Sequence, residues 1–214
     1  MKKAKEIVEV CKKLYLENYI TATDGNVSVR QKDKIFITPK GISKENLSFD
    51  DLVVLDLNGR KVFGKREPSG EYRVHLLVYK ERKDINAVIH THPVFSTSLS
   101  VCGYSLLKPI LPEVFLIVGE IPIVEYGTPY TEELPNKLKK YVKDYNAFIL
   151  KNHGLLTIGK NLEIAFFRTQ KVEYLAKIFF ISKMFGKVDY LNKKQIDKLL
   201  KIRNFEGSKN EYTK

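Results

Sequence analysis

Two of the four histidines in this sequence lie one residue apart, at the end of the apolar run NAVIH. Successive side chains of a strand point to opposite faces, so His90 and His92 project together while Thr91 points away. A third histidine, His153, is followed by Gly154, where the missing side chain leaves room for an imidazole ring. Three imidazoles that leave one position open are the ligand set of a catalytic zinc ion. The spacing predicts a metal site, and the alternative for the pair alone is a hydrogen-bonded sheet edge.

The fourth histidine, His75, lies four residues after Glu71 in a segment with a helical pattern. Residues four apart share one face of a helix, so the two side chains are expected to be neighbours. We interpret His75 as a core residue or as a residue that supports the metal ligands, rather than as a ligand itself.

The elements that must position these residues alternate between helical and strand-like patterns. Pro68 and Ser69 indicate the start of one helix, with Ser69 as its N-cap. The alternation predicts one α/β domain over residues 1–214 with a hairpin-rich sheet, and a C-terminal helix and tail from about residue 186. The predicted elements are a helix over 3–19, hairpins around 32–33 and Asn58-Gly59, a helix from 69, a strand over 86–90, a short helix over 93–101, one or two strands over 113–127, a helix over 131–143, a strand and turn over 146–159, and helices over 161–185 and 193–202.

The composition limits the possible partners. Lys+Arg number 37 against Asp+Glu 25, a net charge of +12, but the lysines are spread along the chain and no nucleic-acid-binding motif accompanies them. We therefore expect no nucleic-acid partner.

No apolar stretch is long enough for a membrane span and the N-terminus is too charged for a secretory signal, so we expect a cytoplasmic protein. Cys11 and Cys102 are far apart and are expected to be reduced packing residues.

Four strings occur in an order and at separations that resemble a known family. They are TDGNVSVR, ITPKGIS, PSGEYRVHLLVYKERKDINAVIHTHP and KNHGLLTIG. Together they resemble the class II aldolase family, which contains L-fuculose-phosphate aldolase and L-ribulose-5-phosphate 4-epimerase, from about residue 5 to residue 180. The resemblance implies a three-layer α/β/α sandwich around a mainly antiparallel sheet, and a ring-like homotetramer with active sites between subunits.

The resemblance also implies roles for individual residues. It assigns zinc, with Mn2+ or Co2+ as possible substitutes, to His90, His92 and His153. Glu71 is implied to be the general base and to approach the metal in the resting site. From the residues alone, Glu71 is a charge near the start of a helix that the helix dipole stabilises.

Three loops are implied to hold a phosphate group through backbone amides and small hydroxyl side chains. Glycine lets amides approach an anion, and a helix start offers unpaired N–H groups. Two positions depart from the family pattern, because Lys40 replaces a common Ser or Thr and Gly70 replaces a second Ser. The phosphate-binding residues implied are Gly25, Asn26, Lys40, Gly41, Ser69 and Gly70.

The reaction implied is the cleavage of a ketose 1-phosphate, similar to L-fuculose 1-phosphate, into dihydroxyacetone phosphate and an aldehyde through an enediolate. The proton donor of the aldolase branch is a Tyr, and the matching position here is Glu113, which is either a catalytic acid or a loop carboxylate. Tyr212 is a candidate to cover the site from the tail. The alternatives are a methylthioribulose-1-phosphate dehydratase that uses Glu113, an L-ribulose-5-phosphate 4-epimerase, and a metal-stabilised binding protein without activity.

Overall fold

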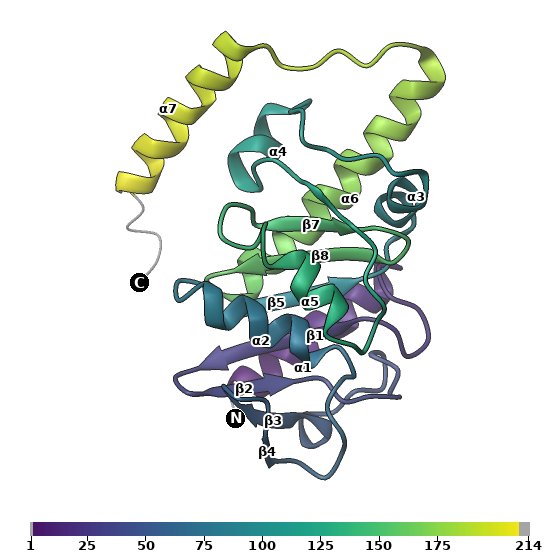
Figure 1. Cartoon of the computed structure of the whole chain (residues 1–214), viewed down its shortest axis with the longest axis vertical. Coiled ribbons are helices and arrows are strands. Elements are labelled where there is room, and N and C mark those ends of the chain that lie inside the picture. Colours follow the sequence, from purple (N-terminus) through teal and green to yellow (C-terminus); the bar gives the residue numbers. More distant parts are fainter. Residues whose placement is uncertain (1, 210–214) are drawn as a thin grey trace.

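A single eight-stranded sheet forms the centre of the molecule (Figure 1). The computed structural model describes residues 2–209, with side chains over residues 3–202. The strands are β1 (Asn26–Gln31), β2 (Lys34–Ile37), β3 (Val53–Asp56), β4 (Lys61–Phe63), β5 (Ala87–Thr91), β6 (Ile123–Val124), β7 (Ala147–Leu150) and β8 (Gly154–Gly159). Their order is β4-β3-β2-β1-β5-β8-β7-β6, and all neighbours are antiparallel except β6 and β7.

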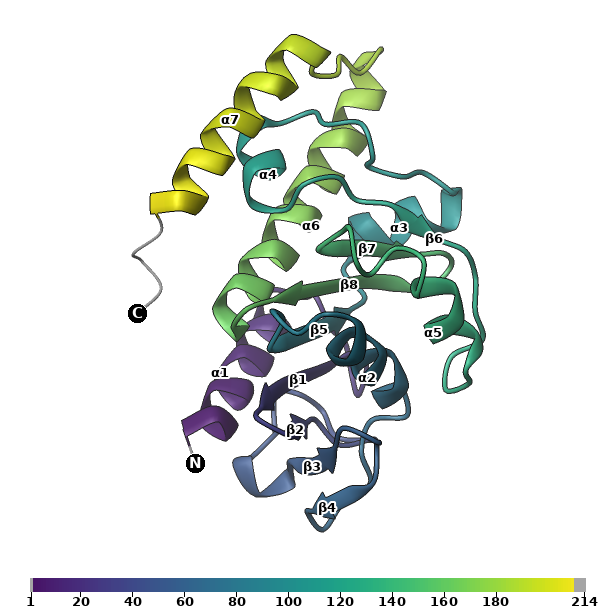
Figure 2. The ribbon, with the colours of Figure 1, turned by 60° about the vertical axis from the view of Figure 1, so that its left-hand side comes forward.

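Helices cover both faces of this sheet, which confirms the predicted three-layer α/β arrangement (Figure 2). One face packs against α2 (Tyr72–Glu81) and α5 (Glu133–Leu138). The other face packs against α1 (Lys2–Leu16), α3 (Val94–Cys102), α4 (Pro112–Ile117) and α6 (Leu162–Phe185). A 3₁₀ helix (Phe49–Asp51) precedes β3, and α7 (Lys193–Lys209) follows α6.

The alternation of side chains along β5 determines which helices each face of this strand contacts. Ala87 and Ile89 pack with α1 and α6, while Val88 packs with α2 on the opposite face. The same alternation continues to His90, which therefore lies on the α2 face. The neighbouring β1 strand pairs Asn26 with His90. Polar side chains of two adjacent strands are thus placed beneath the start of α2.

Most predicted elements are confirmed, and one is wrong. Residues 113–127 were expected to form one or two strands, but Pro112–Ile117 is helical and only Ile123–Val124 is a strand. An apolar run of this length fits a strand or a buried helix equally well. Pro112 decides the outcome, because proline at the first helical position loses no hydrogen bond and already has a helical φ.

Three smaller expectations also need correction. The N-cap of α2 is Glu71 rather than Ser69, because Ser69 and Gly70 belong to a turn that precedes the helix, in which the Tyr72 N–H donates to the Ser69 carbonyl. The β3–β4 turn holds three residues, because Asp56 pairs with Arg60 around it. Cys102 is exposed at the end of α3 and so is not a packing residue, whereas Cys11 is buried.

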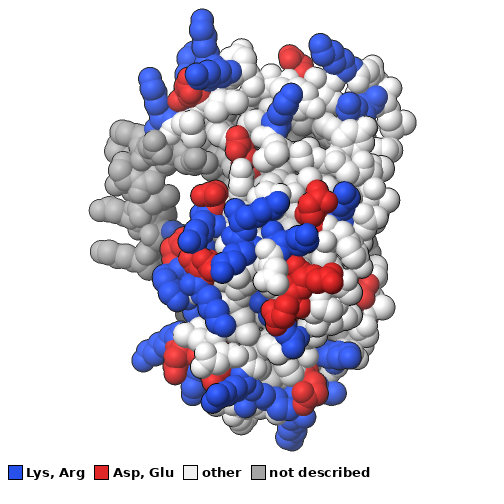
Figure 3. All heavy atoms as spheres, in the orientation of Figure 1, with Lys and Arg blue, Asp and Glu red and all other residues white. Residues whose placement is uncertain are grey.

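Basic and acidic side chains are interspersed on the surface. Figure 3 shows Lys and Arg scattered over the face in view, with Asp and Glu among them. This distribution is typical of a solvated surface with a charge excess. None of the helices in residues 2–209 is long and apolar enough to cross a membrane.

A buried carboxylate fixes the segment that follows the histidine strand. Glu173 of α6 accepts hydrogen bonds from the backbone N–H groups of Phe95 and Ser96, each at 2.8 Å, and from the Ser96 hydroxyl at 2.8 Å. These N–H groups belong to the first turn of α3, where no helical carbonyl is available to accept them. Because α3 begins two residues after His92, Glu173 anchors the chain next to that ring.

We expect Glu173→Gln to lower the free energy of unfolding by about 2 kcal/mol, because an amide supplies one oxygen and a donor where two oxygens now accept. Urea denaturation followed by circular dichroism measures this difference. Glu163→Gln is the matched control, an exposed carboxylate on the same helix, and should change stability by less than about 0.5 kcal/mol. Equal effects of the two substitutions would contradict the anchoring role of Glu173.

Candidate metal centre and active site

The three predicted histidine ligands converge through the same ring atom. His90 lies in strand β5, His92 is the first residue after that strand, and His153 lies in the turn between β7 and β8. The Nε2 atoms of His92 and His90 are 2.9 Å apart, and those of His90 and His153 are 3.2 Å apart. A tetrahedral zinc with bonds of about 2.0–2.1 Å would hold its ligand nitrogens roughly 3.3 Å apart. The cluster therefore fits a divalent metal ion.

The opposite nitrogens of two of the rings, those of His90 and His92, support this arrangement. His90 donates from Nδ1 to the Leu155 carbonyl at 3.0 Å, which leaves the lone pair of Nε2 facing the cluster. The Nδ1 atom of His92 lies 3.6 Å from an oxygen of Asp24. Burial holds the pKa of His90 well below its ordinary value and lowers the pKa of His153 to about 3. Both rings are therefore neutral at pH 7, the form that binds a metal.

Glu71 is the fourth group at this cluster. Its Oε2 atom lies 3.3 Å from Nε2 of His90, and its Oε1 atom lies 3.2 Å from Nε2 of His153. The residue is 8% exposed. Oε2 accepts a hydrogen bond from Asn26 at 2.8 Å, whereas Oε1 has no hydrogen-bond donor in the described part of the chain. One carboxylate oxygen is held and the other remains available next to the histidines.

A buried chain of hydrogen bonds supports Glu71 from behind. A carboxylate only accepts, so the Asn26 amide must donate to Glu71 and turn its oxygen to His75 Nε2, at 2.5 Å. Burial lowers the pKa of His75 to about 3, so its ring is neutral and carries one N–H. That proton lies on Nε2, and Nδ1 accepts from the Ser28 hydroxyl at 2.6 Å. Ser28 in turn accepts from the Tyr79 hydroxyl at 2.7 Å.

This chain accounts for His75 and changes the role of Asn26. His75 is 1% exposed, and its ring nitrogens bond to Ser28 and Asn26 instead of joining the metal cluster, as expected for a residue that supports the site. The side chain of Asn26, predicted to bind phosphate, uses its oxygen for His75 and one N–H for Glu71. One side-chain N–H of Asn26 remains for a ligand.

A cavity of about 230 Å³ opens beside the histidine cluster, and the three loops predicted to bind phosphate line it. All six residues expected at the phosphate line it, together with Glu71, His92 and His153. One further wall of the cavity, the loop that contains Tyr130, was not indicated by any motif in the sequence. The lining residues are Thr23, Asp24, Gly25, Asn26, Pro39, Lys40, Gly41, Ser69, Gly70, Glu71, His92, Pro129, Tyr130 and His153.

Two glycines are required for close packing in this site. Gly25 has a φ of +67°, and a Cβ there would lie 2.4 Å from Cγ2 of Ile20. A Cβ at Gly154 would lie 2.4 Å from the Thr91 carbonyl oxygen and 2.7 Å from Cδ2 of His92. The glycine after His153 therefore admits the ring of His92 rather than that of its own neighbour.

Glu113, one of the other two predicted catalytic residues, is not brought to this cavity within one chain. Glu113 is exposed in the first turn of α4, on the opposite side of the sheet from α2. Tyr212 lies outside the described residues. Asp24, which approaches His92, was missed although it stands next to Gly25 in the string TDGNVSVR.

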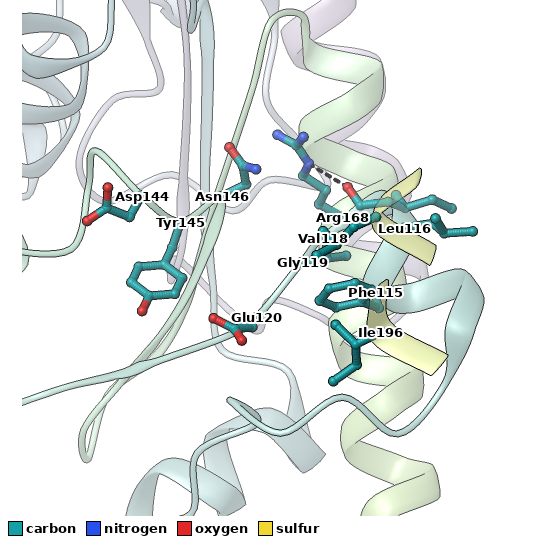
Figure 4. A pocket seen from close by; sticks show the side chains of 12 residues that line it. Phe115, Leu116, Val118, Gly119, Glu120, Asp144, Tyr145, Asn146, Arg168 and Ile196 are labelled. Atoms are coloured by element: carbon teal, nitrogen blue, oxygen red, sulfur yellow. Dashed lines mark hydrogen bonds between the residues drawn. The ribbon is translucent and has the colours of Figure 1, made fainter. Parts of the chain in front are cut away.

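A larger cavity of about 440 Å³ lies elsewhere, between α4, α7 and the turn at residues 144–146 (Figure 4). Arg168 lines it and donates to the carbonyls of Ile117 at 3.2 Å and Ile158 at 2.6 Å. Within the described residues, the three histidines form the one group of side chains arranged to hold a metal. The chemistry that the sequence predicts therefore belongs to the smaller cavity.

Comparisons with known proteins identify the family of this chain. The profile of the family described as Class II Aldolase and Adducin N-terminal domain matches residues 5–180. An L-fuculose phosphate aldolase of Methanocaldococcus jannaschii is 37% identical over 174 residues, which cover 81% of this chain and 93% of that protein. A 5-deoxy-D-ribulose 1-phosphate aldolase of Bacillus thuringiensis is 31% identical over 209 residues, covering 96% of each chain. A solved L-fuculose 1-phosphate aldolase matches with a TM-score of 0.88 at 34% identity, over 93% of this chain and 94% of that one.

A three-layer α/β fold with three converging imidazoles and an adjacent carboxylate defines an enzyme site that is compatible with a divalent metal. The chain belongs to the class II aldolase family, on the branch of the fuculose-phosphate aldolases, and is a lyase.

Replacement of a single ligand should abolish tight metal binding. We expect His90→Ala to lower zinc affinity by at least about 100-fold, because two imidazoles and one carboxylate then remain. Competition with a chromophoric chelator measures the affinity. His75→Gln removes a histidine outside the cluster and should still bind one ion per chain. Full metal content in His90→Ala would refute the ligand assignment.

The buried neutral ring of His75 should make stability depend on pH. The folded state cannot protonate this ring until about pH 3, whereas the unfolded chain protonates it below about pH 6.5. Stability is therefore lost as the pH falls through this window. Between pH 7 and pH 5, metal-free wild-type protein should lose about 2 kcal/mol more than His75→Gln.

Urea denaturation of both proteins at several pH values gives this difference, and the remaining histidines contribute equally to the two curves. Parallel curves for wild type and His75→Gln would contradict the assignment of a neutral, buried His75.

Proposed function

We propose that this protein is a zinc-dependent aldolase that reversibly cleaves a ketose 1-phosphate into dihydroxyacetone phosphate and an aldehyde. The observation that carries the proposal is the position of Glu71, whose carboxylate lies 3.2–3.3 Å from two histidine nitrogens. The same residue lines the cavity formed by the glycine-containing loops. A metal, a base and an anion pocket within one cavity are the parts that this reaction needs.

Zinc is the proposed ion, with manganese or cobalt as substitutes, because three imidazole nitrogens and an open position suit it. When bound, the ion would supply positive charge where negative charge develops on the substrate oxygens.

Glu71 is the proposed base. In the direction of synthesis it removes a proton from C3 of dihydroxyacetone phosphate, and in cleavage it returns that proton. The hydrogen bond from Asn26 fixes Oε2, so Oε1 is the oxygen that exchanges the proton. A base that is held on one side keeps its reactive oxygen in place.

The phosphate of the substrate is assigned to the loops that contain Gly25, Gly41 and Ser69. The Ser69 oxygen accepts a hydrogen bond from the Glu71 N–H at 3.3 Å, which leaves its own O–H free to donate to phosphate. Lys40 adds an ammonium group to the same cavity. A flexible cation placed at the rim attracts an anion without the fixed geometry of arginine.

The substrate proposed is similar to L-fuculose 1-phosphate. The three aldolases compared above are named for fuculose phosphate or for 5-deoxyribulose 1-phosphate, so a ketose phosphate is the class that they share. A dehydratase remains the second candidate because it would use Glu113 as its acid, and an epimerase is the third. Within one chain Glu113 is exposed on α4 and does not line the cavity.

We propose that the protein assembles into a homotetramer, which would explain why Glu113 lies away from the cavity of its own chain. Sites between subunits would let a neighbouring copy supply Glu113 or the C-terminal tail with Tyr212. Exposed apolar side chains on α6, including Met184 and Phe185, support such contacts. A single domain over residues 1–214 and a cytoplasmic location complete the proposal, and the two free cysteines agree with a reducing compartment.

Glu71→Gln should retain the metal and lose turnover. We expect the exchange of a C3 hydrogen of dihydroxyacetone phosphate in deuterium oxide to fall by at least about 100-fold, because glutamine accepts no proton at neutral pH. Proton NMR of the zinc-loaded enzyme with this substrate alone measures the exchange, and no aldehyde is needed.

Glu67→Gln is the matched control, an exposed carboxylate four residues earlier, and should exchange at the wild-type rate. Exchange by Glu71→Gln at the wild-type rate would refute the role of the base. Wild-type enzyme that holds zinc and dihydroxyacetone phosphate without exchange would overturn the aldolase proposal in favour of the dehydratase.

A further inference from the structure

Position 70 requires glycine because the ring of Tyr130 lies against it, and not because of its backbone conformation. Its φ is not among the positive values, so the main chain there would accept any residue. A Cβ at position 70 would instead lie 2.3 Å from Cδ1 and 2.8 Å from Cε1 of Tyr130. The ring of Tyr130 therefore occupies the space that a serine at position 70 would fill. This is the position at which the sequence departs from the two-serine pattern that its family resemblance implies.

Tyr130 is held in a conformation that tyrosine rarely adopts. Its φ is +66°, a left-handed value that costs a bulky residue about 1–2 kcal/mol and persists only where surrounding contacts impose it. Arg73 supplies such contacts from α2. Its guanidinium donates to the Tyr130 carbonyl at 3.4 Å and pairs with Glu132 at 2.7 Å. The helix that presents Glu71 thus also fixes the loop that carries Tyr130.

The side chain of Tyr130 is at the surface of the cavity. It is 66% exposed, yet it lines the same cavity as Lys40 and Ser69. Little apolar area is buried by a ring with this exposure, so its position adds little to stability. Strain without a gain in packing indicates a residue that is kept for what it binds.

We propose that Tyr130 is a substrate-binding residue that replaces the missing serine hydroxyl at position 70. Its ring packs on Gly70 and its phenol donates a hydrogen bond to the phosphate group, beside the ammonium of Lys40. The inference deepens the proposed function, on which it rests, and assigns Gly70 and Tyr130 as a pair that sets specificity for the phosphorylated end of the substrate.

The test uses the zinc-loaded full chain with inorganic phosphate and with dihydroxyacetone phosphate as probes. Isothermal titration calorimetry gives each Kd, and exchange kinetics give KM and kcat separately. We expect Tyr130→Phe to raise both Kd values and KM about 10-fold, because one hydrogen bond to an anion is lost. kcat and the unfolding midpoint should remain at the wild-type level.

The pairing of Gly70 with Tyr130 is tested by a double substitution. Gly70→Ser alone should weaken phosphate binding by at least about 10-fold, since the serine displaces the ring. Gly70→Ser combined with Tyr130→Gly should bind phosphate within about 3-fold of wild type, because a hydroxyl returns and glycine accepts the positive φ.

Wild-type affinity in Tyr130→Phe, or additive effects in the double variant, would overturn the inference. Wild-type protein that binds phosphate with this dependence on Tyr130 but exchanges no C3 hydrogen would support the inference and refute the proposed aldolase reaction. Wild-type protein that does not bind phosphate would refute both.

Discussion

The constraint on which the site depends is the burial of a carboxylate among uncharged imidazoles. Taking an ionised group out of water costs several kcal/mol unless charges or hydrogen bonds replace the water. Glu71 is buried, and burial itself keeps His90 and His153 in the neutral form. The rings cannot balance the carboxylate, and Asn26 supplies one hydrogen bond. A divalent cation among the three ring nitrogens would resolve this imbalance, so the geometry and the electrostatics are both compatible with a metal ion.

The site depends on polar residues that repeat at nearly the same distance along helix α2 and along strand β1. Glu71, His75 and Tyr79 follow one another at intervals of four residues, about 6 Å along α2. Asn26 and Ser28 follow at an interval of two residues, about 6.6 Å along β1. These two spacings are close enough for each polar group of the helix to meet one of the strand. The hydrogen bonds between the two elements hold Glu71 at the end of the row, next to His90 of β5 and His153.

The sequence predicted those parts of the site that depend on local periodicity. His90 and His92 share a face because a strand alternates, and Glu71 and His75 are neighbours because a helix repeats. Contacts that depend on the path of a loop could not be predicted in this way. No local pattern relates Tyr130 to Gly70, 60 positions earlier. An apolar run alone fits a strand or a helix over residues 112–117, and Pro112 at the first helical position favours the helix. The position of Glu113 was uncertain for the same reason.

The hydrogen-bonded row behind Glu71 orients this residue and does not conduct protons. Burial lowers the pKa of His75 to about 3 and raises the pKa of Tyr79 above its ordinary value. Neither group changes charge near neutral pH, and every bond in the row has a defined donor and acceptor. A row with one fixed direction holds the Asn26 amide in one orientation, and thereby keeps the same oxygen of Glu71 directed to the substrate. Changes of activity near pH 7 must therefore arise in Glu71, the metal site or the substrate, because the groups that hold the base keep their protonation states across that range.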